Sequence, residues 1–377
     1  MKVFKDALVY LDGKIKRVDL QFGERIAGFG SEGERIALSE NAVVFPGFID
    51  EHVHGAGGAD AMDGSVGALS VIAQTLAAEG TTGFLATTMT DDGAKIARAM
   101  NAVKEYRQTD PGEGAEVLGV HLEGPFISPE YKGAQNENYV CKPDSAVFGE
   151  WQKASGNAIK LVTLAPEADG AEELIDDLVK KGIVVSIGHT SATHEQIERA
   201  IGAGAGNVTH TFNAMSPLHH REIGAVGSAL LHDELNCELI ADGIHVSVPA
   251  MRLLFKSKPK GKITLITDAI RAKGLGEGES ELGGQKVFVE KGQARLADGT
   301  LAGSVLQMNK AIKRLIKEVG VSVSDAIDAA TITPARTLGI DKDCGSIEIG
   351  KKANFAILDE DFNVLATYRN GKVIFQN

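Results

Sequence analysis

The feature that most restricts how this chain can fold is a regular series of eight apolar runs rich in β-branched residues. Their ends fall near residues 52, 87, 123, 166, 189, 210, 242 and 268. The mean step is about 31 residues, close to the roughly 30 that one strand–helix–strand unit needs. The runs are Val43–His54, Gly83–Thr88, Glu116–Glu123, Lys160–Pro166, Ile183–His189, Asn207–His210, Cys237–Asp242 and Lys262–Asp268.

Helical patterns lie between these runs, at 66–79, 171–181, 192–203 and 248–256. Eight buried parallel strands that alternate with helices predict a (β/α)₈ barrel of the TIM type. Two later helical segments, at 304–319 and 324–338, would close the barrel.

The two ends of the chain have a different pattern, with short strands and tight turns. Asp12-Gly13 and Asn370-Gly371 are dipeptides typical of two-residue hairpin turns. We therefore expect residues 1–45 and 345–377 to form one small β-sandwich domain together. Residues 46–344 would form the barrel, which is the catalytic domain.

Composition excludes several classes of protein. With 43% hydrophobic and 24% charged residues the chain is globular. No apolar run reaches the ~18 residues of a membrane span, and the charged first residues do not resemble a secretion signal. Three widely separated cysteines favour a reducing compartment. The net charge of −12 argues against nucleic acid or an acidic membrane as a partner. We expect a cytoplasmic protein.

Histidines are confined to the barrel segment, since all ten lie between His52 and His245. Five of the eight predicted strands carry, at their ends, the residues of metal-binding types that we take as candidates. In barrel enzymes the carboxyl ends of the strands carry the active site, so the predicted fold would bring these residues to one mouth. They are His52 and His54, Glu123, His189, His210 and Asp268.

Two of these strand ends carry pairs of side chains that share a face. His52 and His54 are two residues apart, as are His121 and Glu123, and alternate residues of a strand point to the same side. Gly55 follows the first pair and would let the backbone bend and a ligand approach. An unpaired Glu123 carboxylate at a buried rim would be costly, and a metal ion would remove that cost.

One imidazole from each of the fifth and sixth predicted strands completes a candidate metal site. His189, His210 and Glu123 form a His₂Glu set that leaves one position open for water, as in catalytic zinc sites. Asp268 ends the eighth strand. It is either the N-cap of the next segment or, facing a metal, a general base.

Several motifs together carry a resemblance to a known family. Pro-Gly-Phe-Ile-Asp-x-His-x-His-Gly occupies residues 46–55 and resembles the signature of the amidohydrolase superfamily. The others, which run nearly end to end, are similar to motifs of the N-acetylglucosamine-6-phosphate deacetylase family within it. They are His-Leu-Glu-Gly-Pro-Phe at 121–126, Gly-His-Thr at 188–190, Thr-His-x-x-Asn-Ala-Met at 209–215, Ala-Asp-Gly-x-His at 241–245, Thr-Asp-Ala at 267–269 and Leu-Ala-Gly-Ser at 301–304.

Carried over residue by residue, the resemblance implies a metal site on Glu123, His189 and His210 and a catalytic acid/base at Asp268. In the family an arginine, here Arg221, reaches across from the neighbouring subunit, which implies a homodimer. The contacts that the resemblance implies for a sugar phosphate are Arg221, His245, Asn213 and Ala214.

The number of metal ions stays open. Family members differ at the second histidine of the first-strand pair and in the loop after Glu-Gly-Pro. This chain has both His52 and His54, and it has Gln135 in that loop, where other members carry a histidine. The combination favours a second ion. We expect one or two divalent ions per subunit, with zinc ahead of iron or another metal.

The resemblance implies hydrolysis of the acetamide of N-acetylglucosamine 6-phosphate to glucosamine 6-phosphate and acetate, a step of amino-sugar catabolism and cell-wall sugar recycling. Asp268 would move the protons, and Gln135 would help to polarise the carbonyl. The galacto epimer is an alternative substrate. A cyclic-amide hydrolase is a weaker alternative, because the fourth strand ends in Leu164-Ala165-Pro166-Glu167 without the lysine of those enzymes. An inactive barrel that serves as a binding scaffold is the alternative outside enzymes.

Overall fold

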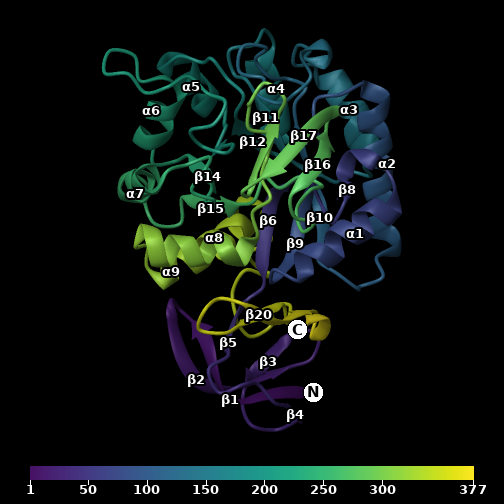
Figure 1. Ribbon diagram of the computed structural model, residues 1–377, viewed down its shortest axis with the longest axis vertical. Helices are drawn as coiled ribbons and strands as arrows, with labels where there is room; N and C mark the ends of the chain where they lie inside the picture. Colours follow the sequence, from purple (N-terminus) through teal and green to yellow (C-terminus); the bar gives the residue numbers. More distant parts are fainter.

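Eight parallel strands form a barrel in which the order of the strands follows the chain (Figure 1). The computed structural model describes residues 1–377. The last strand meets the first where Val53 bridges Ala269 in parallel, which closes the sheet and confirms the predicted barrel. The strands are β6 (Phe48–Val53), β9 (Thr81–Thr87), β10 (Glu116–Glu123), β11 (Ile159–Leu164), β12 (Val184–Ile187), β13 (Asn207–Val208), β14 (Asn236–Ile240) and β15 (Ile263–Ile266).

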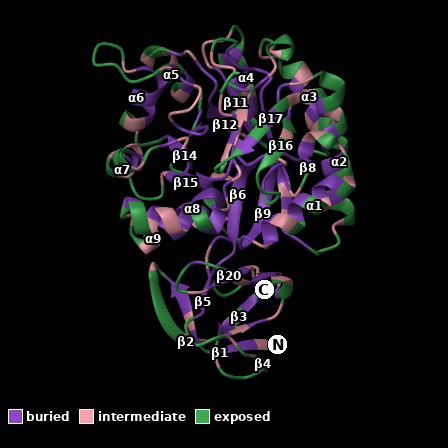
Figure 2. Ribbon diagram, in the orientation of Figure 1, coloured by how far each residue is buried: buried purple, intermediate pink, exposed green.

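The barrel strands are almost entirely buried. Every residue of β6, β9 and β15 is shielded from solvent. Figure 2 shows the buried strands inside a layer of helices whose outer faces are exposed. Strands covered on both faces need apolar residues at consecutive positions, not only at alternate ones. That requirement explains why they appear in the sequence as continuous apolar runs.

Helices surround the barrel, and local capping fixes where several of them begin. Ser65 accepts a hydrogen bond from the amide of Ala68, and Thr193 forms a capping box with Gln196. None of the helices combines the length and apolarity that a membrane crossing needs. The α-helices are α1 (Val66–Ala77), α2 (Gly93–Thr109), α3 (Ser145–Ala154), α4 (Ala171–Lys180), α5 (His194–Gly202), α6 (Gly224–Leu231), α7 (Val248–Ser257), α8 (Met308–Arg314), α9 (Val323–Ala330) and α10 (Ile332–Thr337).

Three predicted elements differ from the structure. The predicted strand 43–54 is split at Gly47 into β5 (Val43–Pro46) and β6, and a side chain at Gly47 would lie 2.3 Å from Thr82. The predicted helix 304–319 begins only at Met308, as α8, and continues as a π-helical turn. The predicted helix 324–338 is broken at Thr331, which has φ −134°, shortly before Pro334, whose missing N–H disfavours a continuous helix.

The two chain ends form one sheet, which lies below the barrel in Figure 1. Phe4 of β1 and Tyr368 of β20 are three strands apart in the sheet, a separation of roughly 14 Å if the sheet were flat. Their ring centroids lie 5.4 Å apart, so the sheet bends over its own core, as expected for a small sandwich. Its strands are β1 (Lys2–Leu11), β2 (Lys14–Phe22), β3 (Ile26–Phe29), β4 (Glu34–Ile36), β5, β19 (Phe355–Leu358), β20 (Val364–Arg369) and β21 (Lys372–Gln376).

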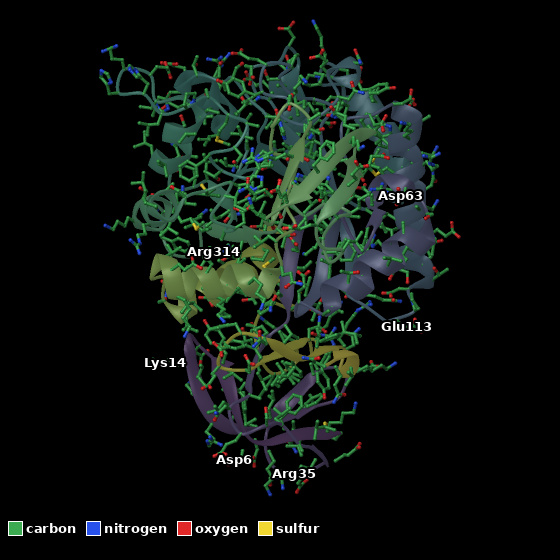
Figure 3. The ribbon with its side chains drawn as sticks, in the orientation of Figure 1. Asp6, Lys14, Arg35, Asp63, Glu113 and Arg314 are labelled. Carbon is green, nitrogen blue, oxygen red and sulfur yellow. The ribbon has the colours of Figure 1, made fainter.

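Charged side chains lie around the outside of this terminal sheet, among them Asp6, Lys14 and Arg35 (Figure 3). Strand β5 leaves the sheet and continues through Gly47 directly into β6. The amino end of β6 therefore faces the terminal sheet, and its carboxyl end, with His52 and His54, lies farther away.

A three-stranded antiparallel sheet follows the last barrel strand and was not predicted. It consists of β16 (Gly278–Leu282), β17 (Gln285–Glu290) and β18 (Gln293–Leu296). Its buried side chains Leu282, Val287 and Val289 pack in one cluster with Met89 and Ala134 from the loops that follow β9 and β10. The sheet therefore covers part of the mouth of the barrel.

A small hairpin, β7 (Gly55–Ala56) and β8 (Ala59–Asp60), follows the first barrel strand. A side chain at Gly55 would lie 2.3 Å from the carbonyl oxygen of Ala59 and 2.8 Å from the amide nitrogen of Arg271. The glycine is therefore required by the close approach of protein backbone, whereas the sequence had suggested the approach of a ligand.

Candidate active site

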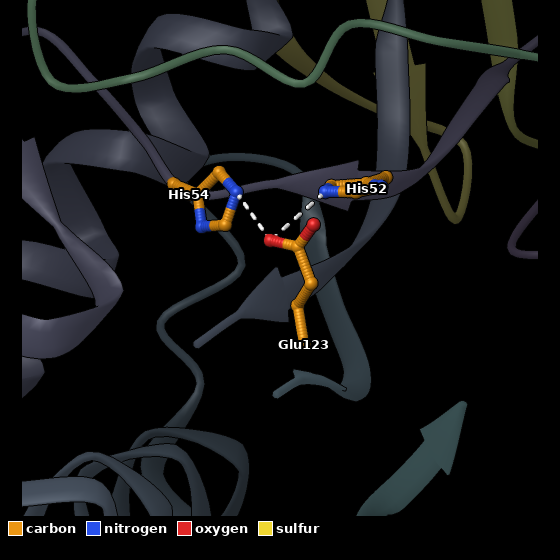
Figure 4. Close-up of side chains that lie close together, drawn as sticks. All are labelled: His52, His54 and Glu123. Carbon is orange, nitrogen blue, oxygen red and sulfur yellow. Dashed lines mark ion pairs between the residues drawn. The ribbon is translucent and has the colours of Figure 1, made fainter. Parts of the chain in front are cut away.

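The carboxylate of Glu123, at the end of β10, lies among four histidines. Its Oε1 lies 3.0 Å from His189 Nε2 and 3.2 Å from His210 Nε2. Its Oε2 lies 3.1 Å from His54 Nε2 and 3.6 Å from His52 Nε2 (Figure 4). The structure thus brings together all five residues that were predicted as metal ligands, from four different strand ends.

Two of the imidazoles have a partner on the ring nitrogen that faces away from Glu123. His189 Nδ1 donates to the backbone carbonyl of Tyr131 at 2.8 Å, and His52 Nδ1 donates to Glu238 at 2.9 Å. Because both partners are acceptors, the neutral rings have their lone pair on Nε2, which faces Glu123. Carbonyl and carboxylate partners of this kind are typical of metal-bound histidines.

The donor set fits a divalent cation. His189 Nε2 and His210 Nε2 are 3.1 Å apart, and both lie near Glu123 Oε1. A tetrahedral site with bonds of about 2.0–2.1 Å has edges of roughly 3.3–3.4 Å between its ligand atoms. Two imidazole nitrogens and one carboxylate oxygen also leave a fourth position open, as catalytic zinc sites do.

Asp268 follows β15 and faces the His52–His54 side of Glu123. Its Oδ1 lies 3.2 Å from His54 Nε2 and 3.4 Å from His52 Nε2. Burial alone would raise the pKa of Asp268, but His52 and His54 lower it to about 2. For His54 the opposing effects are burial, which lowers the pKa, and the two carboxylates, which raise it to about 9. Asp268 is therefore ionised at neutral pH.

Three of these residues have a backbone conformation that is rare outside glycine. The φ angles of His189, His210 and Asp268 are 48°, 30° and 47°. Such conformations cost about 1–3 kcal/mol each and are found mainly at functional sites. At Asp268 the backbone is held by its amide, which donates to the carbonyl of His52 at 2.9 Å. Strain is thus concentrated where strands end and side chains turn toward the mouth.

A cavity of about 320 Å³ lies above these side chains. It is lined by most of the predicted site residues, by the loop after β10 and by the segment around the three-stranded sheet. His52 does not line it, because it lies fully buried beneath. The predicted residues along the wall are His54, Glu123, Gln135, His189, His210, Asn213, Ala214, His245 and Asp268.

Gln135 and His245 are each fixed by a hydrogen bond. The side-chain oxygen of Gln135 accepts from the amide of Thr90 at 2.7 Å, which leaves its NH₂ group as the available donor. His245 Nδ1 lies 2.7 Å from Asp242 Oδ2. Burial would lower the pKa of His245, but Asp242 outweighs it and raises that pKa above its ordinary value.

Arg221 lies apart from the other predicted site residues. It does not line the cavity of its own chain; it is exposed on the loop before α6, where its Nη1 lies 2.7 Å from His220 Nε2. Its predicted contact with a phosphate could therefore be made only by reaching another copy of the chain or after the loop moves.

Sequence reasoning missed several residues that support the site. Glu238 lies in the middle of β14, is fully buried, and accepts from both His52 Nδ1 and the amide of His210. A carboxylate inside an apolar strand was the available signal, because such a group needs a partner. Tyr131 and Thr90 act through backbone atoms, which have no signature in the sequence. His121, which the sequence had paired with Glu123, is buried beneath the site, and its Nε2 lies 2.7 Å from the hydroxyl oxygen of Thr163.

This chain is similar to known proteins along nearly its whole length. Residues 43–374 match the Amidohydrolase family. The chain is 42% identical to the N-acetylglucosamine-6-phosphate deacetylase of Bacillus subtilis (strain 168), with 99% of this chain and 94% of that protein covered. It is 38% identical to the N-acetylgalactosamine-6-phosphate deacetylase of Escherichia coli O157:H7, over 87% and 86% of the two chains. The crystal structure of N-acetylglucosamine-6-phosphate deacetylase from Pasteurella multocida matches all of both chains with a TM-score of 0.93 and 32% identity.

A parallel barrel with a histidine and glutamate cluster at its strand ends defines a class of metal-dependent hydrolases. The chain belongs to the amidohydrolase family.

Proposed function

We propose that this enzyme hydrolyses the acetamide of N-acetylglucosamine 6-phosphate and releases glucosamine 6-phosphate and acetate. The observation that carries the proposal is that Glu123, His189, His210 and Asp268 meet at one cavity. The enzymes of this name to which the chain is related along nearly its whole length give the substrate. The reaction belongs to amino-sugar catabolism and the recycling of cell-wall sugars.

Glu123, His189 and His210 would hold a divalent ion, and the donor set suits zinc best. His52 and His54 would hold a second ion on the other oxygen of Glu123. When bound, such an ion acts as a Lewis acid and lowers the pKa of water toward neutrality.

Asp268 is the proposed general base and acid. It accepts a proton from the attacking water and returns it to the amine nitrogen as the C–N bond breaks. A base must be ionised. Positive charge at His52 and His54, carried either by the protonated rings or by an ion that they hold, lowers the pKa of Asp268 and keeps it ionised at neutral pH. His52 and His54, on the same oxygen, fix the direction in which the carboxylate points.

Gln135 is the proposed donor to the carbonyl oxygen of the acetamide. Its side-chain oxygen is occupied by the amide of Thr90, so its NH₂ group is the part available to a ligand in the cavity. A fixed donor at the oxygen where negative charge develops stabilises the transition state more than the ground state.

His245, Arg221, Asn213 and Ala214 are the proposed contacts of the phosphate, and all of them except Arg221 line the cavity of their own chain. Asp242 favours the charged form of His245, which suits a phosphate group. Arg221 is exposed and absent from its own cavity, which supports a homodimer in which it reaches the cavity of the partner. In an Arg221→Ala variant we expect KM to rise for the phosphorylated sugar and to stay unchanged for the free sugar. An unaltered preference for the phosphorylated sugar would contradict this role.

The galacto epimer is the second candidate substrate, because the Escherichia coli relative of similar identity is named for it. A cyclic-amide hydrolase is not favoured. After β11 no lysine is available, and Glu167 there accepts hydrogen bonds from the hydroxyls of Thr190 and Ser191. We also infer a cytoplasmic location, which three unpaired cysteines support.

The test is acetate release from three sugars, with metal analysis on the same batch of enzyme. The sugars are N-acetylglucosamine 6-phosphate, its galacto epimer and unphosphorylated N-acetylglucosamine. We expect kcat/KM to be highest for the first and lowest for the third. Faster hydrolysis of the epimer would reassign the substrate, and no acetate from metal-loaded enzyme with any of them would overturn the proposal.

A further inference from the structure

A second group of metal-binding side chains lies outside the barrel, between α5 and α6. His194 and Glu198 are one helical turn apart on α5, and His232 directly follows α6. One ligand atom from each of the three lies within 4.8 Å of the other two. None of them lines the cavity above Glu123, so the group has no part in the proposed reaction.

The hydrogen bonds of His194 leave its Nε2 free for a ligand. Its Nδ1 lies 2.9 Å from the hydroxyl oxygen of Ser228, and that hydroxyl donates its own proton to the carbonyl of Gly224 at 2.7 Å. The oxygen must therefore accept from Nδ1, and the neutral ring has its lone pair on Nε2. This Nε2 lies 3.6 Å from Glu198 Oε1.

His232 also has a nitrogen without a partner. Its Nδ1 lies 3.5 Å from a carboxylate oxygen of Glu234, whereas its Nε2 is buried and makes no hydrogen bond. The rings of His194 and His232 lie against each other with centroids 5.5 Å apart. A surface pair of oppositely charged residues on α5 would account for His194 and Glu198, but not for the position of His232.

The distances suit a metal ion better than direct contacts. At 3.6 Å, His194 Nε2 and Glu198 Oε1 are too far apart for a hydrogen bond. They are close to the edge of roughly 3.4 Å that two ligand atoms share in a tetrahedral zinc site. Two imidazoles bound to one such ion have ring centroids roughly 5 Å apart, near the 5.5 Å found here.

We propose that His194, Glu198 and His232 bind a divalent transition-metal ion, with two imidazoles and one carboxylate as in His₂Glu zinc sites. The side chain of Glu198 is 55% exposed, so the ion can enter from solvent. The site ties α5 to α6. It also lies beside the loop that carries Arg221, because Glu222 of that loop accepts from the amides of His194 and Gly224.

The test is equilibrium dialysis of the metal-loaded enzyme against increasing free Zn²⁺, with bound zinc counted per chain. We expect the wild-type enzyme to bind one equivalent beyond the zinc of the barrel. Glu198→Gln and His232→Asn each remove one ligand and should weaken this extra binding at least about tenfold. Glu198 is on the surface, so its variant should fold normally, and acetate release should stay unchanged.

The matched control is His220→Asn, which removes an exposed histidine outside the cluster and should keep the extra equivalent. Copper(II) added to enzyme whose barrel already holds zinc gives an independent readout. Nitrogen couplings in its electron paramagnetic resonance spectrum report bound imidazole and should be lost in His232→Asn but not in His220→Asn. The proposal is overturned if the wild-type enzyme binds no additional zinc. It is also overturned if Glu198→Gln and His232→Asn bind it as the wild type does, or if His220→Asn loses it.

Discussion

The two oxygens of Glu123 divide the active site into halves that differ in what surrounds them. On the Oε1 side are His189 and His210, both on the wall of the cavity, and the outer partner of His189 is a neutral backbone carbonyl. On the Oε2 side are His54 and the fully buried His52, whose outer partner is the carboxylate of Glu238.

Only the second half contains Asp268. The comparison indicates that the halves have different tasks. The first half is a complete His₂Glu ligand set that opens on the substrate, and the second half positions the proposed base and offers a place for a second ion. Substitutions that act on one half or on both should therefore have separable effects on metal content and on turnover.

The largest effect is expected from Glu123→Gln, because it changes both halves at once. Losing a residue that only hydrogen-bonds to a metal ligand already costs about 10–100-fold in metal affinity. Glu123 is itself a ligand and serves both halves, so its loss should cost more. We expect the variant to retain little metal and almost no acetate release. Metal analysis and an activity assay on the same sample measure this, with circular dichroism as the control for folding. Normal metal content would show that the two halves are not joined through Glu123.

A smaller and more selective effect is expected from His52→Asn, which alters only the second half. The Glu123–His189–His210 set stays intact, so one ion should remain bound, while any second ion is lost. Because His52 also helps to hold Asp268, kcat should fall, but by less than the roughly 10²–10⁴-fold that removal of a general base costs. Loss of all metal from this variant would contradict the division into halves. The control is His189→Asn, which alters only the first half.

The sequence predicted the ligands of both halves but not the groups that support them. Ligand residues at the ends of strands interrupt apolar runs, so Glu123, His189 and His210 were visible as polar exceptions. Glu238 was overlooked because one carboxylate inside the predicted run 237–242 does not reveal which histidine it will face. The carbonyl of Tyr131 could not be predicted, since a backbone acceptor leaves no trace in residue type.

The barrel was predictable for a related reason. Parallel strands that are buried on both faces need long apolar runs, and helices between them impose a regular spacing. The three-stranded sheet β16–β18 lacks both features, because it is half exposed and its strands follow one another through tight turns. Its alternating buried and exposed residues in β17 were the available signal. The location of Arg221 relative to a second copy of the chain cannot be read from one sequence.

The smallest effect is expected at the phosphate end of the cavity, where His245 lies. Burial lowers the pKa of His245, but Asp242 and Asp268 raise it and outweigh both burial and the nearby charge of Arg295. The imidazolium should therefore persist above its ordinary pKa of about 6.5. KM for the phosphorylated sugar should therefore stay low as the pH passes about 6.5. It should rise only at higher pH, where the His245 ring loses its proton.

In Asp242→Asn the raising partner is lost, so the rise in KM should move to lower pH. Measuring KM from roughly pH 6 to 9 tests this, because the window brackets the ordinary histidine pKa. The unphosphorylated sugar is the control, and its KM should not follow the same curve. Identical pH profiles for Asp242→Asn and the wild-type enzyme would remove His245 from the phosphate site.

The most direct test of the whole account is acetate release by Asp268→Asn, with the metal content of the same preparation determined. Asparagine keeps the size of the side chain but cannot accept a proton. We predict a metal content equal to that of the wild-type enzyme and a fall in kcat of roughly 10²–10⁴-fold on N-acetylglucosamine 6-phosphate. Near-normal turnover with the metal in place would contradict the central claim that Asp268 carries the proton in this site.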